Sequence, residues 1–176
     1  MSGLILPHHG IWPKVDKALY IAPNATIIGD LEAGENCSFW FGCVARADVN
    51  TIRIGNRSNV QDLSMLHVSY KTGPLVIGDD VTIGHSCVLH GCTVGNRVLV
   101  GMGSIIMDGA VIGDDVIIGA GSLVTEGTQV PSGSLVIGRP GQVKRPLKSA
   151  EIAYLKESAE RYQHVARSYK GGPWPF

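Results

Sequence analysis

Aliphatic side chains recur at every sixth position along most of this chain, with small or polar residues between them. Three series keep this interval: Ile54, Val60 and Leu66; Ile77, Ile83 and Leu89; and Val94, Val100, Ile106, Ile112, Ile118 and Val124. A period of six matches neither the 3.6-residue repeat of a helix nor the two-residue alternation of an ordinary strand. It is typical of a parallel β-solenoid, in which each hexapeptide forms one flat side and three sides complete a triangular coil.

Interruptions of the interval mark where the coils depart from regularity. The interval from Leu66 to Ile77 is eleven positions instead of six, which predicts a corner loop with about five extra residues around positions 69–74. The interval from Leu89 to Val94 is only five positions, so one residue is missing there. At the start of the solenoid, the predicted inward residues are Ile28, Ala33, Phe39 and Ala45.

A change of period predicts a helix after the solenoid. The stretch Gly138–Pro146 is rich in turn residues, and Ser149 suits an N-cap with Glu151 in the first turn. Apolar residues then recur at three- and four-residue spacing, as in an amphipathic helix: Ile152, Leu155, Ala159, Tyr162, Ala166 and Tyr169. We therefore expect a solenoid domain at 1–147 with repeats at about 20–140, a helix at 148–170 and a tail at 171–176.

The composition agrees with a narrow, tightly wound coil. Glycine makes up 23 of 176 residues and directly follows many of the repeating aliphatics, and aromatic residues are only 6%. We interpret the glycines as residues that let the chain turn sharply between sides, and the shortage of aromatics as a result of the narrow interior. The predicted class is an all-β solenoid, a parallel β-helix of hexapeptide repeats with a C-terminal α-helix.

Charge and hydropathy argue against several kinds of partner. The chain has 15 basic and 15 acidic residues, so it lacks the basic surplus of a general nucleic-acid binder. It contains no 18-residue apolar run to span a membrane, and its first ten residues do not read as a secretory signal. The four cysteines have no CxxC spacing, which predicts reduced thiols in a cytoplasmic protein, with disulfides or metal ligation as the alternative: Cys37, Cys43, Cys87 and Cys92.

Two histidines occupy matching positions in the repeat. His67 and His90 each follow an inward leucine in the third hexapeptide of its series, so they are predicted on the same side of successive coils. Adjacent strands lie about 4.7–4.9 Å apart, which lets two imidazoles bind one metal ion. The alternative is that these are unrelated polar residues on the outer surface, which is how we interpret His8, His9 and His164.

A third histidine, His85, lies two residues after the inward Ile83, on the preceding side of the coil. Five extended residues from His85 to His90 span roughly 16 Å, whereas zinc holds its nitrogen ligands at about 2.0–2.1 Å. The register therefore predicts that a neighbouring subunit supplies its own His85. Threefold symmetry repeats this contact and closes a homotrimer.

Several motifs together resemble one family: Ser38–Trp40, Val44–Asp48, Ile52–Gly55, Asn59–Asp62, His67, Gly84–His85 and His90–Gly91. Over nearly its whole length, the chain is similar to the γ-class carbonic anhydrases. The resemblance implies a left-handed coil and a trimer that shares each metal ion between subunits, with His67, His85 and His90 as ligands. It also implies reversible hydration of CO₂ to bicarbonate by metal-bound hydroxide. Zinc is the expected metal, and imidazole ligands also suit iron or cobalt.

The family pattern assigns roles to three further residues. By resemblance, Gln61 hydrogen-bonds metal-bound water or bicarbonate, a task that suits an amide because it both donates and accepts. Asn59 is expected in the same region, and Tyr162 matches a helix tyrosine that approaches the metal in relatives. The alternatives are a solvated surface amide for Gln61 and plain packing for Tyr162.

Charged residues form a second group by resemblance. Arg46 and Asp48 match a pair that makes ionic contacts across the trimer interface in relatives, and Asp62 is expected to join them by binding Arg46 through both oxygens. The alternative is a surface ion pair of little energetic value. Trp40 is expected to pack in the core or at an interface.

One departure from the family pattern concerns proton transfer. The loop after His67 reads Val-Ser-Tyr-Lys-Thr-Gly-Pro, without the glutamate that shuttles protons in the best-characterised active relatives, which favours weak turnover. Two other functions stay open: an acyl-CoA thioesterase or acyltransferase-related hexapeptide protein, and a non-catalytic metal-binding scaffold. Recognition of coenzyme A would need basic residues near the cleft, and Lys71 is the only basic residue in the corner loop.

Overall fold

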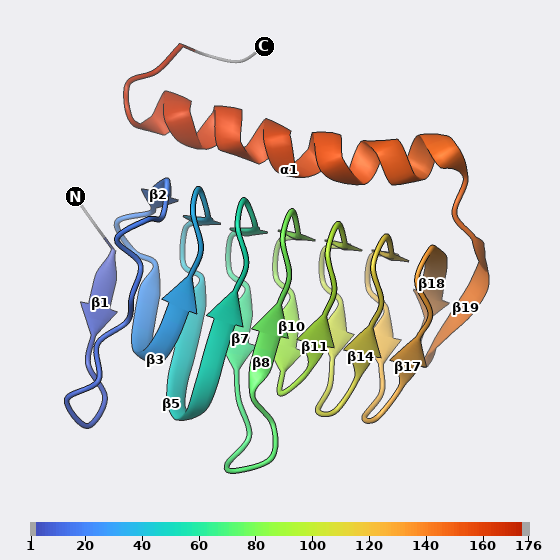
Figure 1. Cartoon of the computed structure of the whole chain (residues 1–176), viewed down its shortest axis with the longest axis horizontal. Coiled ribbons are helices and arrows are strands. Elements are labelled where there is room, and N and C mark those ends of the chain that lie inside the picture. Colours follow the sequence, from blue (N-terminus) through green and yellow to red (C-terminus); the bar gives the residue numbers. More distant parts are fainter. Residues whose placement is uncertain (1–2, 174–176) are drawn as a thin grey trace.

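The computed structural model describes residues 3–173 as a left-handed parallel β-helix of about seven turns, with helix α1 (Ser149–Tyr169) laid along it (Figure 1). Each turn has three sides, as the six-residue period predicts. Sides 1 and 2 belong to one sheet, because the long strands β3 (Thr26–Ala33) and β5 (Val44–Ile54) extend across both. Side 3 is a separate sheet, and α1 contacts it.

The strands of each side stack from coil to coil. Side 1 consists of β7 (Met65–His67), β10 (Val88–His90), β13 (Ile105–Ile106) and β16 (Leu123–Val124). Side 2 consists of β8 (Leu75–Ile77), β11 (Thr93–Val94), β14 (Val111–Ile112) and β17 (Gln129–Val130). Side 3 consists of β2 (Tyr20–Ile21), β4 (Ser38–Phe39), β6 (Asn59–Val60), β9 (Thr82–Ile83), β12 (Leu99–Val100), β15 (Ile117–Ile118) and β18 (Ser134–Gly138). At the two ends, β1 (Leu4–Leu6) pairs in parallel with β3, and β19 (Gly141–Pro146) pairs antiparallel with β18.

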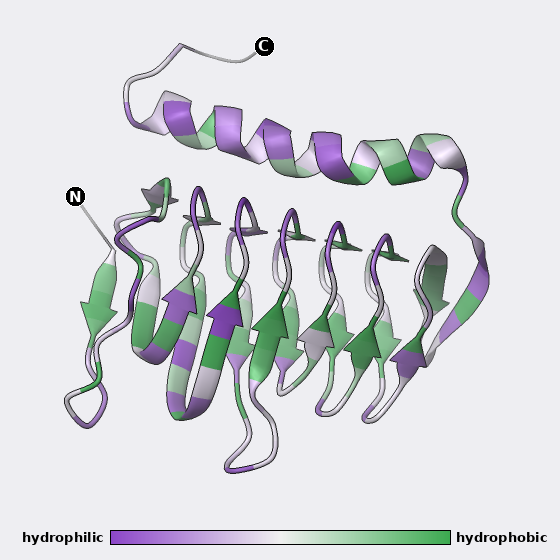
Figure 2. Ribbon diagram, in the orientation of Figure 1, coloured by the Kyte–Doolittle hydropathy of each residue, from purple (hydrophilic) through white to green (hydrophobic). Residues whose placement is uncertain are grey.

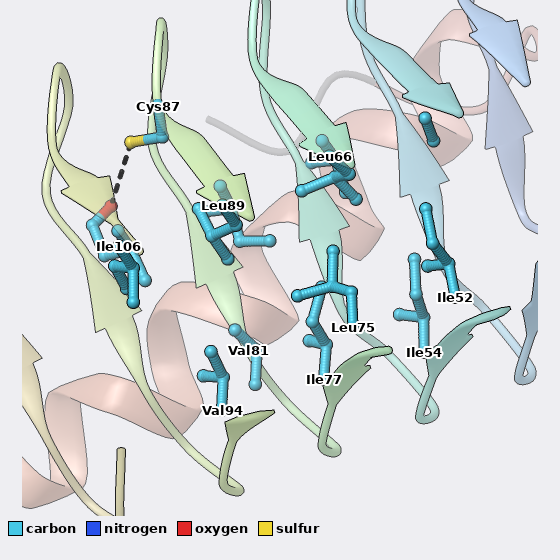
Figure 3. Packing of buried hydrophobic residues seen from close by; sticks show 14 of the residues in the cluster. Ile52, Ile54, Leu66, Leu75, Ile77, Val81, Cys87, Leu89, Val94 and Ile106 are labelled. Carbon is cyan, nitrogen blue, oxygen red and sulfur yellow. Dashed lines mark hydrogen bonds between the residues drawn. The ribbon is translucent and has the colours of Figure 1, made fainter. Parts of the chain in front are cut away.

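The repeating aliphatics fill the interior of the coil. Leu66, Leu89 and Ile106 are fully buried and lie in one row along side 1 (Figure 3). Burying one such side chain contributes about 1.5–3 kcal/mol, so the six-residue repeat itself supplies the main driving force for the fold. The inward positions predicted from the period are confirmed in these coils.

The first coils differ from the prediction at one position. Phe39, Ala45 and Ala33 are buried as expected, but the inward residue of β3 is Ile27, and Ile28 is only partly buried. Ile27 lies opposite Ala45 in the strand pairing. Since a shift of one residue moves a strand side chain to the other face, the prediction of Ile28 was wrong.

The glycines that follow the aliphatics have a different role from the predicted one. Gly78 and Gly95 lie outside the left-handed φ region. A Cβ on Gly78 would come within 2.7 Å of the backbone of Gly95, and one on Gly95 within 2.9 Å of that of Gly113. Glycine is therefore required because successive coils approach closely. Left-handed backbone occurs elsewhere along the coils, for example at Asn36 and Asp80.

Helix α1 runs back along side 3 and contacts β9, β4 and β2. Leu155, Ala159 and Ala166 are buried against the sheet. Most of the polar residues of the helix, coloured purple in Figure 2, are exposed. Tyr162 packs edge-on against Trp40, which is 4% exposed, at a ring-centroid distance of 5.6 Å. Within residues 3–173, no helix is long and apolar enough to cross a membrane.

The start of α1 also differs from the prediction. Lys148, rather than Ser149, is the N-cap. The carboxylate of Glu151 accepts a hydrogen bond from the backbone N–H of Lys148 at 2.7 Å and pairs with the Arg145 guanidinium at 2.7 Å. Glu151 thus anchors the first turn of the helix to the preceding strand β19.

Candidate metal centre

His67 and His90 end neighbouring strands on side 1. Strands β7 and β10 pair in parallel with His90 directly opposite His67, the placement that the register predicts. Nδ1 of His67 lies 2.9 Å from Nε2 of His90, and the ring centroids are 4.9 Å apart. The two side chains are 17% and 32% exposed, so both rings are reachable from outside the coil.

Each imidazole is held on its other nitrogen by a carboxylate. Asp48, on β5, lies 3.2 Å from Nε2 of His67, and Asp108, which follows β13, lies 2.8 Å from Nδ1 of His90. A carboxylate only accepts hydrogen bonds, so these nitrogens carry the hydrogens and the facing nitrogen of each neutral ring is bare. The two facing nitrogens, 2.9 Å apart, can therefore share a proton or bind one metal ion. We call Asp48, His67, His90 and Asp108 the strand cluster.

Arg46 supports this cluster through an ion pair with Asp48. Burial alone raises the pKa of Asp48, but hydrogen bonds from Arg46 and His67 bring it below its usual value. Burial lowers the pKa of His67, against the opposing effect of Asp48. At neutral pH the cluster thus combines an ionised carboxylate with a neutral imidazole, the form of histidine that binds metal.

His85 lies in the corner between sides 3 and 1, after β9. Its Nδ1 is 2.8 Å from Oδ2 of Asp62, and its side chain is 45% exposed. Asp62 was expected to bind Arg46, but within the chain it contacts His85 instead. In the part of the chain that the structure describes, no group of three His, Cys, Asp or Glu side chains forms a metal site by itself.

Gln61 and Asn59 lie on side 3. Gln61 is 4% exposed, so it is not a solvated surface amide. Its Nε2 donates to Oδ1 of Asn59 at 3.1 Å, and Nδ2 of Asn59 donates to Oγ1 of Thr82 at 3.1 Å. Thr82 hydrogen-bonds Ser158 of the helix at 3.2 Å. These hydrogen bonds fix the orientation of the Gln61 amide. The sequence alone had not indicated Thr82 or Ser158 as part of this network.

A cavity of about 410 Å³ lies between α1 and side 3. His85, Gln61, Tyr162 and Arg161 line it together with apolar side chains. Burial raises the pKa of Tyr162 to about 12, so its phenol is neutral at physiological pH. The structure therefore brings three predicted site residues to one cavity, apart from the strand cluster. We call Asn59, Gln61, His85 and Tyr162 the helix-side cluster.

Comparison with known proteins identifies the family of the chain. A family model described as bacterial transferase hexapeptide (six repeats) matches residues 91–126. Over 162 residues, 89% of this chain and 59% of the relative, the sequence is 44% identical to gamma carbonic anhydrase 1, mitochondrial, of Arabidopsis thaliana. Over 167 residues, 95% of this chain and 91% of the relative, it is 43% identical to a carbonic anhydrase of Geobacillus kaustophilus. The chain belongs to the γ-class carbonic anhydrase family.

This γ-class chain also has a close counterpart among solved structures. A hexapeptide transferase family protein from Anaplasma phagocytophilum is 46% identical, with a TM-score of 0.89, over 94% of this chain and 98% of that chain. The chain spans only about 59% of the length of the plant relative. The comparisons therefore establish family and fold, and the activity is argued separately below.

Two residues near the site of this γ-class member were not predicted. Asp108 contacts His90 and also accepts a hydrogen bond from the hydroxyl of Ser69, in the corner loop (residues 69–74). Burial alone raises the pKa of Asp108, but the hydrogen bonds from Ser69 and His90 lower it below its usual value. The sequence contained one feature that could have indicated this contact: Asp108 lies 18 residues, or three hexapeptides, after His90.

Proposed function

We propose that this protein is a metal-dependent carbonic anhydrase-like enzyme that reversibly hydrates CO₂ to bicarbonate as a homotrimer. The observation that carries the proposal is the strand cluster, where ring nitrogens of His67 and His90 face each other at 2.9 Å while carboxylates hold their other nitrogens. Two nitrogens bound tetrahedrally to one zinc ion at 2.0–2.1 Å are about 3.3 Å apart, so the pair needs little movement to bind a metal.

The donor set fits a catalytic metal site once a third imidazole is added. His85 is exposed at a corner, and its Nδ1 is already engaged by Asp62, so its Nε2 is the nitrogen that can serve as a ligand in a site shared with a neighbouring subunit. Three neutral imidazoles are a known zinc ligand set that leaves one position open, and iron or cobalt suits the same set. When bound there, the metal supplies Lewis-acid chemistry that lowers the pKa of water towards neutrality.

The chain's own residues orient the reaction. Asp48 holds the His67 imidazole in the tautomer that leaves its facing nitrogen free. Gln61, fixed through Asn59, presents an uncharged amide that can hydrogen-bond an oxygen of CO₂ or bicarbonate. The loop after His67 has no carboxylate, so the proton released in each cycle passes to water or buffer and turnover is weak.

The test compares wild-type protein with His67→Ala and with His164→Ala, an exposed helix histidine, as control. Metal content is measured by elemental analysis and CO₂ hydration by stopped flow. We expect His67→Ala to lose bound metal and to hydrate CO₂ on the order of 100-fold more slowly or worse, a larger loss than removal of an outer partner causes. The control is expected to keep both. Hydration that survives complete metal removal would refute the proposal.

A second candidate function follows from the transferase hexapeptide match at residues 91–126. It is cleavage or transfer of an acyl group from acyl-coenzyme A. The same preparations are assayed for acyl-CoA hydrolysis, and cleavage without CO₂ hydration would favour this candidate. Full metal occupancy with neither activity would instead indicate a metal-binding scaffold.

A further inference from the structure

We propose that Asp108 is a positioning residue for the metal ligand His90, and that Ser69 of the corner loop holds Asp108 in place. The proposal rests on the metal site of the proposed function. Oδ2 of Asp108 lies 2.8 Å from Nδ1 of His90, and Oδ1 accepts a hydrogen bond from Ser69 Oγ. Both carboxylate oxygens are therefore engaged, one by each neighbour.

The surrounding backbone is shaped around this carboxylate. Gly91 directly follows His90, and a Cβ on Gly91 would collide with Oδ1 of Asp108. A Cβ on Gly73 of the corner loop would lie 3.2 Å from the same oxygen. Gly91 also has a φ angle of +53°, which a side chain rarely adopts. Two glycines thus leave the space that the carboxylate of Asp108 occupies.

The corner loop is tied to the site from two directions. Its Ser69 carbonyl accepts a hydrogen bond from Nδ2 of Asn50 at 3.0 Å, and its Ser69 hydroxyl donates to Asp108. The loop leaves the coil directly after His67 and protrudes from it (Figure 1). The five-residue insertion therefore contributes the Ser69–Asp108 contact. Through Asp108 this contact helps to orient His90 at Nδ1, while Nε2 of the same ring faces His67.

The equivalent position one coil further along shows what this contact adds. Glu126 follows β16 as Asp108 follows β13, but it is exposed to solvent. Both positions thus carry an acidic residue, but of the two only Asp108 contacts an imidazole, that of His90. Removing a partner of this kind typically lowers metal affinity by about 10- to 100-fold.

Metal affinity is the first readout. Zinc dissociation constants are measured by competition with a chromophoric chelator for wild type, Asp108→Ala, Asp108→Asn and Ser69→Ala, with Glu126→Gln as the matched control. Asp108→Ala is expected to bind zinc about 10- to 100-fold more weakly. Asp108→Asn keeps an oxygen acceptor and should fall between it and wild type, and Ser69→Ala should show a smaller loss. Unchanged affinity in folded Asp108→Ala would overturn the proposal.

The tautomer of His90 is the second readout and does not depend on bound metal. In ¹⁵N-histidine NMR spectra of the metal-free protein, the His90 ring should carry its hydrogen on Nδ1 in wild type and in Glu126→Gln. Asp108→Ala should shift the ring towards the Nε2–H form. The same tautomer in both proteins would contradict the role of Asp108. If wild type binds no metal while the tautomer responds as expected, the proposed function fails and the positioning role stands.

Discussion

The strand cluster and the helix-side cluster are the two halves of the proposed site, and they are built differently. In the strand cluster, strand register places His67 opposite His90, and carboxylates fix both rings. In the helix-side cluster, Gln61 is buried at 4% exposure, while the His85 side chain projects from a corner at 45% exposure, against 17% for His67. The strand cluster holds two ligands in place, and the exposed His85 of the helix-side cluster is suited to contact another subunit.

The largest expected effect comes from mixing two inactive variants. If each site combines the strand cluster of one chain with His85 of the next, His67→Ala and His85→Ala are each inactive alone. In trimers assembled randomly from equal amounts of the two, about one quarter of the sites contain all three histidines. We therefore expect about a quarter of wild-type CO₂ hydration after the variants are unfolded and refolded together.

The control for this experiment is the same mixture without subunit exchange, which should stay inactive. A site formed within one chain predicts no recovery under any mixing protocol. Such a result, with wild type refolding to full activity, would contradict the proposal that each site combines the strand cluster of one chain with His85 of the next.

A smaller effect is expected from Gln61→Ala, which alters only the helix-side cluster. Losing one hydrogen bond to the reacting oxygen, of about 1–1.5 kcal/mol, lowers kcat/KM about tenfold. Metal content should not change, because the ligands and their carboxylates remain. Gln129→Ala, at an exposed glutamine of β17, is the control. Loss of metal in Gln61→Ala would show that the clusters are not separable.

The smallest effect is expected at the anchor of α1, which covers the helix-side cluster. The Arg145 guanidinium and the Lys148 backbone N–H lower the pKa of Glu151 from 4.5 to about 2. A carboxylate with a depressed pKa stabilises the fold above its unfolded-state pKa and loses this contribution as the pH falls towards the folded-state value. The Tm difference between wild type and Glu151→Gln should therefore be full at neutral pH and shrink between about pH 4.5 and 2. A constant difference over this range would contradict the anchoring role.

Much of the strand cluster was predictable from sequence because strand pairing follows the repeat. The positions of Leu66 and Leu89 in their series were enough to place His67 opposite His90. Asp108 escaped prediction although it lies three hexapeptides after His90, because the pairing of β10 with β13 ends at Ile106 and the contact is made by side chains beyond it. The role of Gln61 as a buried amide also escaped, since its burial depends on surroundings far away in the sequence.

The sequence by itself determined the coil, since an aliphatic residue at every sixth position has to enter a shared interior, and with it the pairing of His67 with His90. It also indicated the C-terminal helix through a change of period. Only the tertiary structure decided that Ile27 points inwards, that Gly78 is required by the next coil, and that Asp108 holds His90. These features depend on distances of a few ångströms between coils, which a pattern along one chain does not contain.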